Sequence, residues 1–345
     1  MRLIFFLAAL LFSFMTSAQT PQFAVVRPDG TTYICPTLDS AYNKAVPDDI
    51  IYLPGGSFTL SGSIDKRIKI FGAGSDEDSC FYTGPTILAS LSIGPNASNG
   101  SMEGIKVGSI VFNSPTSITN YTIKRCYFGG GISFVNSTTV EFLSVTNCYL
   151  GASTPGGGGS NSFSFYGSGT INNSSFSNNR ITSDVSMGGI SNLFTNNIFF
   201  PAGSYRSVSL FHGSTYQNNI FQAGMGSSCN NSFFYNNING NPQPIFNNII
   251  FNSVGETPDL TFINPGIISI YGWINYDKHN DYHLKASSLG KNTGTDATDR
   301  GDYGGVLPWA EGMVPSNPHI YFKQVAPVTN SSGQLPVQFK VRTNN

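Results

Sequence analysis

Charged side chains are scarce in this chain, and their scarcity excludes several classes of function. The 345 residues include only 18 Lys and Arg and 19 Asp and Glu, or 11% charged, against roughly 25% in ordinary globular domains. Its surface must therefore be covered by Asn, Ser, Thr and Gly, which suits short strands joined by tight turns. With a net charge of −1 and no basic cluster, we expect neither nucleic acid nor an anionic membrane surface as a partner.

Long apolar runs are absent beyond the N-terminus, so no membrane span is expected. At the N-terminus, Arg2 precedes an apolar run over 3–14, and small residues follow at 16–18. This order is typical of a signal peptide and its cleavage site. The sequence therefore predicts a signal peptide over 1–18, a mature chain from Gln19, and a secreted protein that is extracellular, periplasmic or held at the cell surface.

Cysteines are few, with five in the chain, and in an exported protein they can form disulfides. Cys126 and Cys148 are 22 residues apart, the length of one plausible turn of a repeat. If they occupy neighbouring strands, about 4.8 Å apart, a disulfide between them is sterically allowed. The alternative is that both are small buried side chains stacked in a core.

The region after the signal peptide predicts a strand, a short helix and a second strand. Residues 23–26 are apolar and β-branched, and Asp29-Gly30 indicates a turn. A helical face, ended by Pro47, follows at Leu38, Ala41, Tyr42 and Ala45, and a strand is expected over 50–53. We expect this helix to lie as a lid across the open end of a stack of strands.

From about 58 to 260, short apolar runs alternate with Gly, Asn, Ser and Pro, and almost no helical period is present. The clearest periodic signal is a pair of asparagines, at steps of 18, 22 and 18 residues for Asn178, Asn196, Asn218 and Asn236. Asn tolerates the left-handed backbone of a sharp turn, and stacked amides can donate and accept along an axis. Such a repeat predicts a solenoid, whose core grows along one axis without adding domains.

The fold predicted from these patterns is all-β. We expect a single-stranded right-handed parallel β-helix solenoid over 19–310, with an N-terminal capping helix, followed by a short Pro-rich C-terminal extension over 311–345. Within that extension, 335–341 alternates like a strand.

These motifs resemble the pectin-lyase-like superfamily of right-handed parallel β-helix proteins, over roughly residues 30 to 310. The resemblance is carried by the capping helix with Asp48–Gly56, the rung Ile68–Gly74 and the recurring Asn pairs. Asp281–Leu284 and Asp302–Gly305 look like the last turn of exported proteins of the Bacteroidetes type. The resemblance implies the fold strongly and the activity weakly, because the superfamily includes lyases, hydrolases, esterases, adhesins and proteins without known chemistry.

Candidate catalytic residues are few. A glycoside hydrolase needs a pair of carboxyl groups, yet the only charged residues between 142 and 255 are Arg180, Asp184 and Arg206. A polysaccharide lyase acting by β-elimination on a uronate needs one base and one cation, and Arg180, Arg206 and His212 could line one face. The alternative is local pairing, such as Arg180 with Asp184.

No cofactor motif and no metal site is predicted, and Ca²⁺ is considered only for the case that the chain is a lyase. The acidic residues Asp296, Asp299 and Asp302 suggest calcium ligands, but turns stabilised by side-chain to backbone hydrogen bonds explain them better.

Aromatic residues give a further indication of function, with 16 Tyr and 27 Phe in the chain. Exposed rings can stack on sugar faces, and Tyr166, Tyr205 and Tyr216 are the candidates chosen for carbohydrate binding. We therefore expect an exported module that contacts polysaccharide as a binding or surface-structural protein. A polysaccharide lyase is the first alternative, and an adhesin or self-assembling surface protein the second.

Overall fold

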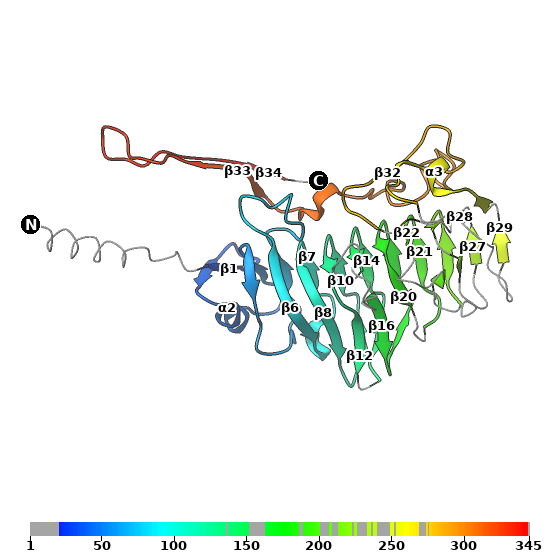
Figure 1. Cartoon of the computed structure of the whole chain (residues 1–345). Coiled ribbons are helices and arrows are strands. Elements are labelled where there is room, and N and C mark those ends of the chain that lie inside the picture. Colours follow the sequence, from blue (N-terminus) through cyan, green and yellow to red (C-terminus); the bar gives the residue numbers. More distant parts are fainter. Residues whose placement is uncertain are drawn as a thin grey trace, which may run out of the picture.

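The structure is a computed structural model in which the chain forms a β-solenoid, as predicted. Its parallel strands stack from β3 to β29, and the C-terminal part of the chain lies along their side (Figure 1). None of the helices it describes is long and apolar enough to cross a membrane. The predicted signal peptide, residues 201–206 and residues 209–212 lie outside the described residues. The structure describes residues 21–135, 137–151, 163–185, 189–200, 207–208, 213–222, 224–225, 233–235, 237–239, 249–251, 253–268, 274 and 276–343.

The first face of the solenoid is a 12-stranded sheet. Wherever side chains are described, the central residue of each three-residue parallel strand is buried and forms the core. This follows from the alternation of side chains along a strand, which turns the two flanking residues outward. The parallel strands are β3 (Ile50–Tyr52), β5 (Lys69–Phe71), β7 (Ser101–Glu103), β10 (Thr122–Lys124), β14 (Ser144–Thr146), β18 (Ser175–Ser177), β21 (Leu193–Thr195), β24 (Thr215–Gln217), β27 (Phe233–Tyr235) and β29 (Ile249–Phe251).

A second sheet of 13 strands forms another face. Its main column consists of β4 (Gly56–Phe58), β6 (Thr86–Ile93), β8 (Lys106–Asn113), β11 (Tyr127–Phe128), β15 (Tyr149–Leu150), β19 (Arg180–Ile181), β22 (Ile198–Phe199), β25 (Ile220–Phe221), β28 (Ile238–Asn239) and β30 (Val254–Gly255). The second half of β8 also pairs with a branch formed by β12 (Ile132–Val135), β16 (Phe163–Gly167) and β20 (Ser183–Val185). Smaller elements are η1 (Pro95–Ala97), the sheet β9 (Ile118–Thr119), β13 (Thr139–Glu141) and β17 (Thr170–Asn172), and the pair β23 (Ser207–Val208) and β26 (Gly224–Met225).

Sharp turns connect the strands, and two columns of residues with left-handed backbone form them. We call the second column the outer turn column: Gly104, Arg125, Asn147, Asn178, Asn196 and Asn218, with φ between 51° and 69°. The first column is Asn99, Asn120, Phe142, Asn173, Ser191 and Gly213, and both columns advance by the same steps. Asn is enriched in this conformation because its short polar side chain tolerates it.

The residue after each outer turn points inward, and three of these residues, Asn179, Asn197 and Asn219, form an asparagine ladder with Asn237 of the next rung. The first three Nδ2 atoms donate to Oδ1 of the next rung, at 3.0, 2.9 and 3.2 Å, and all four donate to a strand carbonyl oxygen. The Oδ1 atoms in turn accept a backbone N–H from the preceding rung. The predicted amide stacking is confirmed, and the ladder leaves no amide atom in this column without a partner.

Cys126 and Cys148 occupy the same inward column on the rungs before the ladder. Both are free, fully buried thiols, and the Cys126 N–H lies 3.4 Å from Cys148 Sγ. Of the two alternatives, the structure therefore shows the stacked, buried pair. Large rings fill the core beside this column: Phe194 stacks between Phe176 and Tyr216, with centroid separations of 4.6 and 4.8 Å.

The N-terminal end is closed as predicted. The strand β1 (Phe23–Val26) runs antiparallel to both β2 (Thr32–Cys35) and β3. The helix α2 (Leu38–Lys44) follows, with a capping box between Thr37 and Ser40 and with Leu38 and Ala41 buried. It ends at Lys44, with Ala45 as its C-cap, because Pro47 cannot continue a helix.

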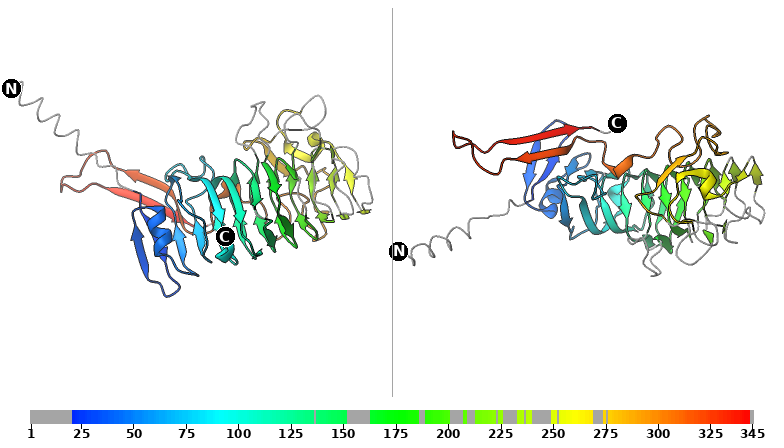
Figure 2. Two further views of the ribbon diagram at one scale, coloured as in Figure 1. Left: turned by 90° about the horizontal axis from the view of Figure 1, so that it is seen from below. Right: turned by 45° about the horizontal axis from the view of Figure 1, so that its top comes forward.

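After β30 the chain leaves the stack and returns along its outside. It forms α3 (Pro258–Thr261) and the antiparallel pair β31 (Phe262–Asn264) and β32 (Asp281–Leu284). Residues 295–316, which we call the strap, contain η2 (Glu311–Met313) and run back toward the N-terminal end (Figures 1 and 2). The expectation of a last turn at Asp302–Gly305 is wrong, because these residues belong to the strap and form no strand.

Beyond the strap, β33 (His319–Val325) and β34 (Val337–Arg342) form an antiparallel two-stranded ribbon. The strand predicted over 335–341 is therefore present as β34. The ribbon lies beside the N-terminal rungs, and its turn extends past β1 (Figures 1 and 2). All six residues of β34 are exposed, so this strand is the least covered element of regular structure in the described chain, whereas β33 begins with the buried His319.

Candidate functional site

The outer turn column holds the strap, one rung at a time. Because a left-handed asparagine turns its side chain outward, its amide can bond to a chain lying across the turns. Successive contacts run against the rung order: Asn218 with Thr295, Asn196 with Asp299, Asn178 with Asp302 and Gly304, Asn147 with Leu307 and Ala310, and Arg125 with Val314, at 2.7 to 3.2 Å. The strap is therefore bound along five consecutive rungs.

At its far end the strap fits a position where no side chain projects. Gly104 has φ +69°, and a Cβ placed there would lie 2.7 Å from the Pro315 ring. Beside it, the carboxylate of Glu103 accepts hydrogen bonds from the N–H and hydroxyl of Ser316, at 2.7 and 3.1 Å. The absence of a side chain at Gly104 therefore fixes where the strap crosses the rung of Gly104, one rung before that of Arg125.

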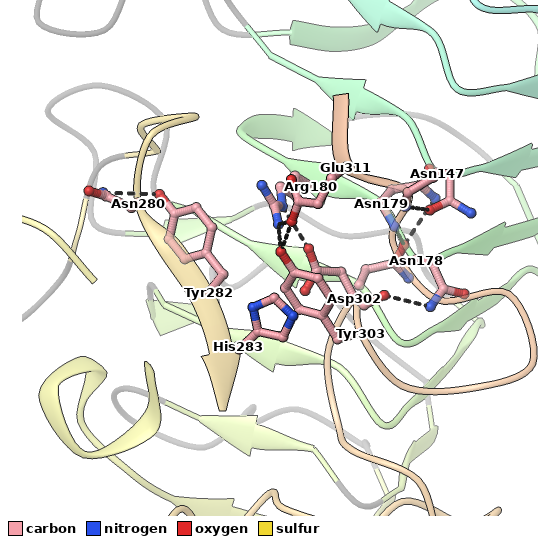
Figure 3. Close-up of polar contacts among 12 residues, drawn as sticks. Asn147, Asn178, Asn179, Arg180, Asn280, Tyr282, His283, Asp302, Tyr303 and Glu311 are labelled. Atoms are coloured by element: carbon pink, nitrogen blue, oxygen red, sulfur yellow. Dashed lines mark hydrogen bonds and ion pairs between the residues drawn. The ribbon is translucent and has the colours of Figure 1, made fainter. Parts of the chain in front are cut away.

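Arg180 is the largest fully buried side chain in the described chain and lies beneath the strap. It follows Asn178 and Asn179, so the same turn that builds the ladder directs its side chain out of the solenoid core. Its Nε lies 2.6 Å from Asp302 Oδ2, and the two side chains are 2% and 1% exposed. Nη2 donates to the Tyr303 hydroxyl at 3.0 Å and lies 4.0 Å from Glu311 Oε1. Figure 3 shows these groups converging on the guanidinium.

Aromatic rings enclose the guanidinium on its remaining sides. Its Cζ lies 4.2 Å from the ring centroid of Trp309, 4.8 Å from that of Tyr282 and 5.6 Å from that of Tyr303. At these distances the π-faces attract the cation, and the attraction grows when water is excluded. His283 stacks on the outer side of Tyr303, at 3.6 Å between centroids, and contacts Asp281 Oδ1 through Nδ1 at 2.7 Å.

The electrostatics of this cluster favour a fixed ion pair. Burial opposes the charge of Arg180, but Asp302 and the neighbouring tyrosines outweigh it and raise the pKa of Arg180. For Asp302, burial outweighs the lowering effect of the guanidinium and raises the pKa. Because Arg180 Nε lies 2.6 Å from Asp302 Oδ2, we nevertheless assign the ionised carboxylate. Burial raises the pKa of Tyr303, so its hydroxyl keeps its proton at neutral pH and donates to Glu311.

The geometry therefore places Arg180 in a structural role. A lyase would need this cation to face a substrate carboxylate, but the guanidinium is enclosed by the chain's own groups. Arg180 pairs with Asp302, 122 residues away, and the side chain of Asp184, the local partner considered from the sequence, lies outside the described residues. Arg206 and His212 lie outside the described residues, so their convergence with Arg180 stays a prediction.

The predicted sugar-binding tyrosines meet different outcomes. Tyr216 is fully buried, as the central residue of β24 between Phe194 and Phe221, so its expected place on the surface is corrected. The reason is the strand alternation, which turns the middle residue of a three-residue strand inward. Tyr166 lies in β16, but its side chain is outside the described residues, and Tyr205 lies outside them entirely.

The three aspartates considered as calcium ligands are held by protein groups. Asp302 pairs with Arg180, Asp299 contacts Lys291 Nζ at 2.7 Å, and Asp296 Oδ1 accepts the N–H and hydroxyl of Thr298. Across the described part of the chain, no group of three or more His, Cys, Asp or Glu side chains is placed to hold a metal ion.

A second cluster, on the surface, was not singled out from the sequence. We call it the ribbon patch: Phe81, Tyr82, Tyr321, Phe322, Lys340 and Arg342. Tyr82 packs between Phe81, with 5.2 Å between centroids, and Phe322, with 5.9 Å. Lys340 lies over the Phe322 ring at 5.4 Å, and Arg342 over the Tyr321 ring at 5.2 Å. Phe81 is 80% exposed, an unusual position for a large ring.

Sequence reasoning could not find this patch because its two halves are about 240 residues apart in the chain. They become neighbours only because the strap carries the ribbon back to the N-terminal rungs. Phe81-Tyr82 belongs to the loop after β5, whereas the other four residues belong to the ribbon. Comparison of the chain with known protein families, with curated proteins and with solved structures found no match.

Proposed function

We propose that the chain is an exported carbohydrate-binding or surface-structural module in which the solenoid supports the ribbon patch as the contact with polysaccharide. The observation that carries this proposal is the exposure of neighbouring rings, above all Phe81 at 80% and Tyr82 at 38%. Flat apolar rings at a surface suit the C–H faces of sugars, and polar atoms at the rim fix their orientation.

The resemblance to the exported pectin-lyase-like superfamily supports the same proposal, because many of its members act at polysaccharides. Its support is limited to an analogy of fold. A lyase is supported less well than a binding module, since Arg180, the candidate cation within the described residues, is only 2% exposed.

The direct test is binding of the mature chain, from Gln19, to a panel of neutral and acidic polysaccharides, measured by affinity electrophoresis and calorimetry. We expect Phe81→Ala to weaken binding about tenfold, equivalent to about 1.4 kcal/mol. Because this ring packs mainly against one neighbour, its removal should leave the unfolding transition unchanged.

A matched control is Phe142→Asn, which removes another exposed ring, 53% accessible, on a different part of the solenoid. Position 142 has φ +56°, and Asn occupies the equivalent turns at 120 and 173, so this variant should fold and bind like the parent. Failure of the parent to bind any glycan, or equal losses in both variants, would remove the proposal.

A further inference from the structure

The ribbon has an outer face that is apolar and exposed. Directly opposed residues of an antiparallel pair share a face, and Phe322, opposite Lys340, lies on the face that turns toward Tyr82 of the solenoid. The reverse face, which we call the outer face, carries Lys323 and the apolar residues Ile320, Val325, Val337, Phe339 and Val341. The last four of these are 46 to 62% exposed. A two-stranded ribbon is by itself marginally stable in water, so a partner on this face would stabilise it.

A second exposed apolar surface lies in residues 256–268, which we call the excursion, where the chain leaves the stack after β30. Leu260, Ile263 and Ile267 are 56, 54 and 92% exposed. Ile263 points away from the solenoid because its neighbour Phe262 is buried against it. The strand β31 pairs only with β32 among the described strands, so it also has an edge that a further strand could join.

The two surfaces carry opposite charge. Residues 312–345 contain three cations and no Asp or Glu, and Lys323, on the outer face, forms no ion pair with any carboxylate that the structure describes. The excursion contains two acidic residues and no Lys or Arg. One of them, Asp259, is exposed and forms no ion pair with a described cation. Glu77 and Asp78, in the loop that meets the reverse face of the ribbon, are each paired with a lysine. Charge complementarity therefore favours contact between the outer face and an excursion.

The ribbon and the excursion lie on the same side of the solenoid, near its opposite ends (Figures 1 and 2). We propose that two copies of this chain form an antiparallel dimer, in which the outer face of each ribbon packs on the excursion of the other copy. A two-fold axis perpendicular to the solenoid turns one copy over and reverses its direction, so both contacts form together. Two-fold dimers are the commonest closed assemblies of identical chains. The dimer contact is separate from the proposed polysaccharide contact, because Phe322 and Lys340 of the ribbon patch lie on the reverse face.

The test is sedimentation velocity of the mature chain over a range of concentrations. We expect the weight-average mass to rise from that of a monomer to that of a dimer between about 1 µM and about 100 µM, the affinity of a small interface. The mass should then stay constant, because a two-fold contact closes on itself.

Phe339→Asp places a charge on the outer face of the ribbon, and Ile263→Asp places one on the excursion. Each should raise the dissociation constant at least about tenfold, because both contacts of the homodimer then contain one altered surface. An equimolar mixture of the two variants should recover part of the dimer, since the unaltered ribbon of one meets the unaltered excursion of the other. The matched control Phe142→Asp alters a ring that is 53% exposed elsewhere on the solenoid, and it should dimerise like the parent.

Circular dichroism of all three variants should match the parent, because the three positions are exposed. A parent that stays monomeric over this range of concentrations overturns the inference. Masses that rise beyond a dimer overturn the two-fold arrangement, and a dimer that persists in Ile263→Asp overturns the excursion as the partner and identifies a ribbon-to-ribbon contact. Phe81→Ala, the variant that tests carbohydrate binding, should dimerise like the parent, so the failure of one proposal is distinguishable from that of the other.

Discussion

Replacing Arg180 by methionine should loosen the strap, because it leaves the ionised Asp302 carboxylate beneath the strap without its counter-charge. Both side chains of this pair are almost completely buried, at 2% and 1% exposure. Removing one partner of a buried ion pair costs about 3–5 kcal/mol. Loss of the cation–ring contact with Trp309, at 4.2 Å, adds roughly 0.5–2 kcal/mol, which methionine packed on the same ring offsets in part. We therefore expect a loss of about 4 kcal/mol in strap docking.

The assay combines urea unfolding, followed by circular dichroism, with limited proteolysis read by mass spectrometry. Stability is not uniform within a protein, so cleavage within 295–316 should accelerate before the solenoid unfolds. The double variant Arg180→Met/Asp302→Leu removes both charges and should recover most of the loss. Arg67→Met breaks an exposed pair with Asp48, at 47% and 53% exposure, and should cost less than about 1 kcal/mol. An unchanged rate of cleavage within 295–316 in Arg180→Met would refute the role of Arg180 in holding the strap.

Three further predictions concern the ladder, the strap and the thiols. Asn197→Ala removes four hydrogen bonds to buried groups and should lower the unfolding free energy by roughly 3–5 kcal/mol; a loss below about 1 kcal/mol in urea would contradict the ladder's role. Gly104→Ala places a Cβ 2.7 Å from Pro315 at φ +69°, so it should lower the unfolding free energy by about 1–2 kcal/mol and accelerate proteolysis at 314–316. The control Gly62→Ala adds a Cβ that meets no atom within 4 Å and should change neither the stability nor the rate of cleavage. Burial and the charge of Asp76 raise the pKa of Cys80 to about 12. A disulfide reagent at pH 8 should therefore modify this thiol only after the protein unfolds. Rapid modification of Cys80 in the native protein would argue against its burial.

The repeat was readable from the sequence because each of its causes is local. Asn178 and Asn196 recur at the spacing of a rung because left-handed turns select asparagine. The capping helix was readable for the same reason, since Leu38 and Ala41 mark its buried face and Pro47 its end. Strand alternation should also have placed Tyr216 inside. That prediction failed because the boundaries of a three-residue strand, Thr215–Gln217, are not apparent in a run of alternating polar and aromatic residues.

The strap and the two clusters it creates could not be predicted in the same way. Arg180 has a charged neighbour in sequence, Asp184, and nothing local indicates that its partner is Asp302, 122 residues away. The motif around Asp302 was noticed for its aspartates and glycines, but the strap does not pair as a strand and leaves no periodic signal. Its register depends on the outward amides of the turns, which can be located only when the solenoid is known.

The paired asparagines explain how one dipeptide supports both the core and the strap. In Asn178-Asn179, the first residue has φ +54° and donates outward to two strap carbonyls, at 2.8 and 2.7 Å. The second residue donates inward, to Asn197 Oδ1 and to a strand carbonyl. Because the left-handed turn directs adjacent side chains to opposite sides of the backbone, the solenoid and the strap stay in register rung by rung. The position of the ribbon patch is therefore determined by the same turns that build the rungs.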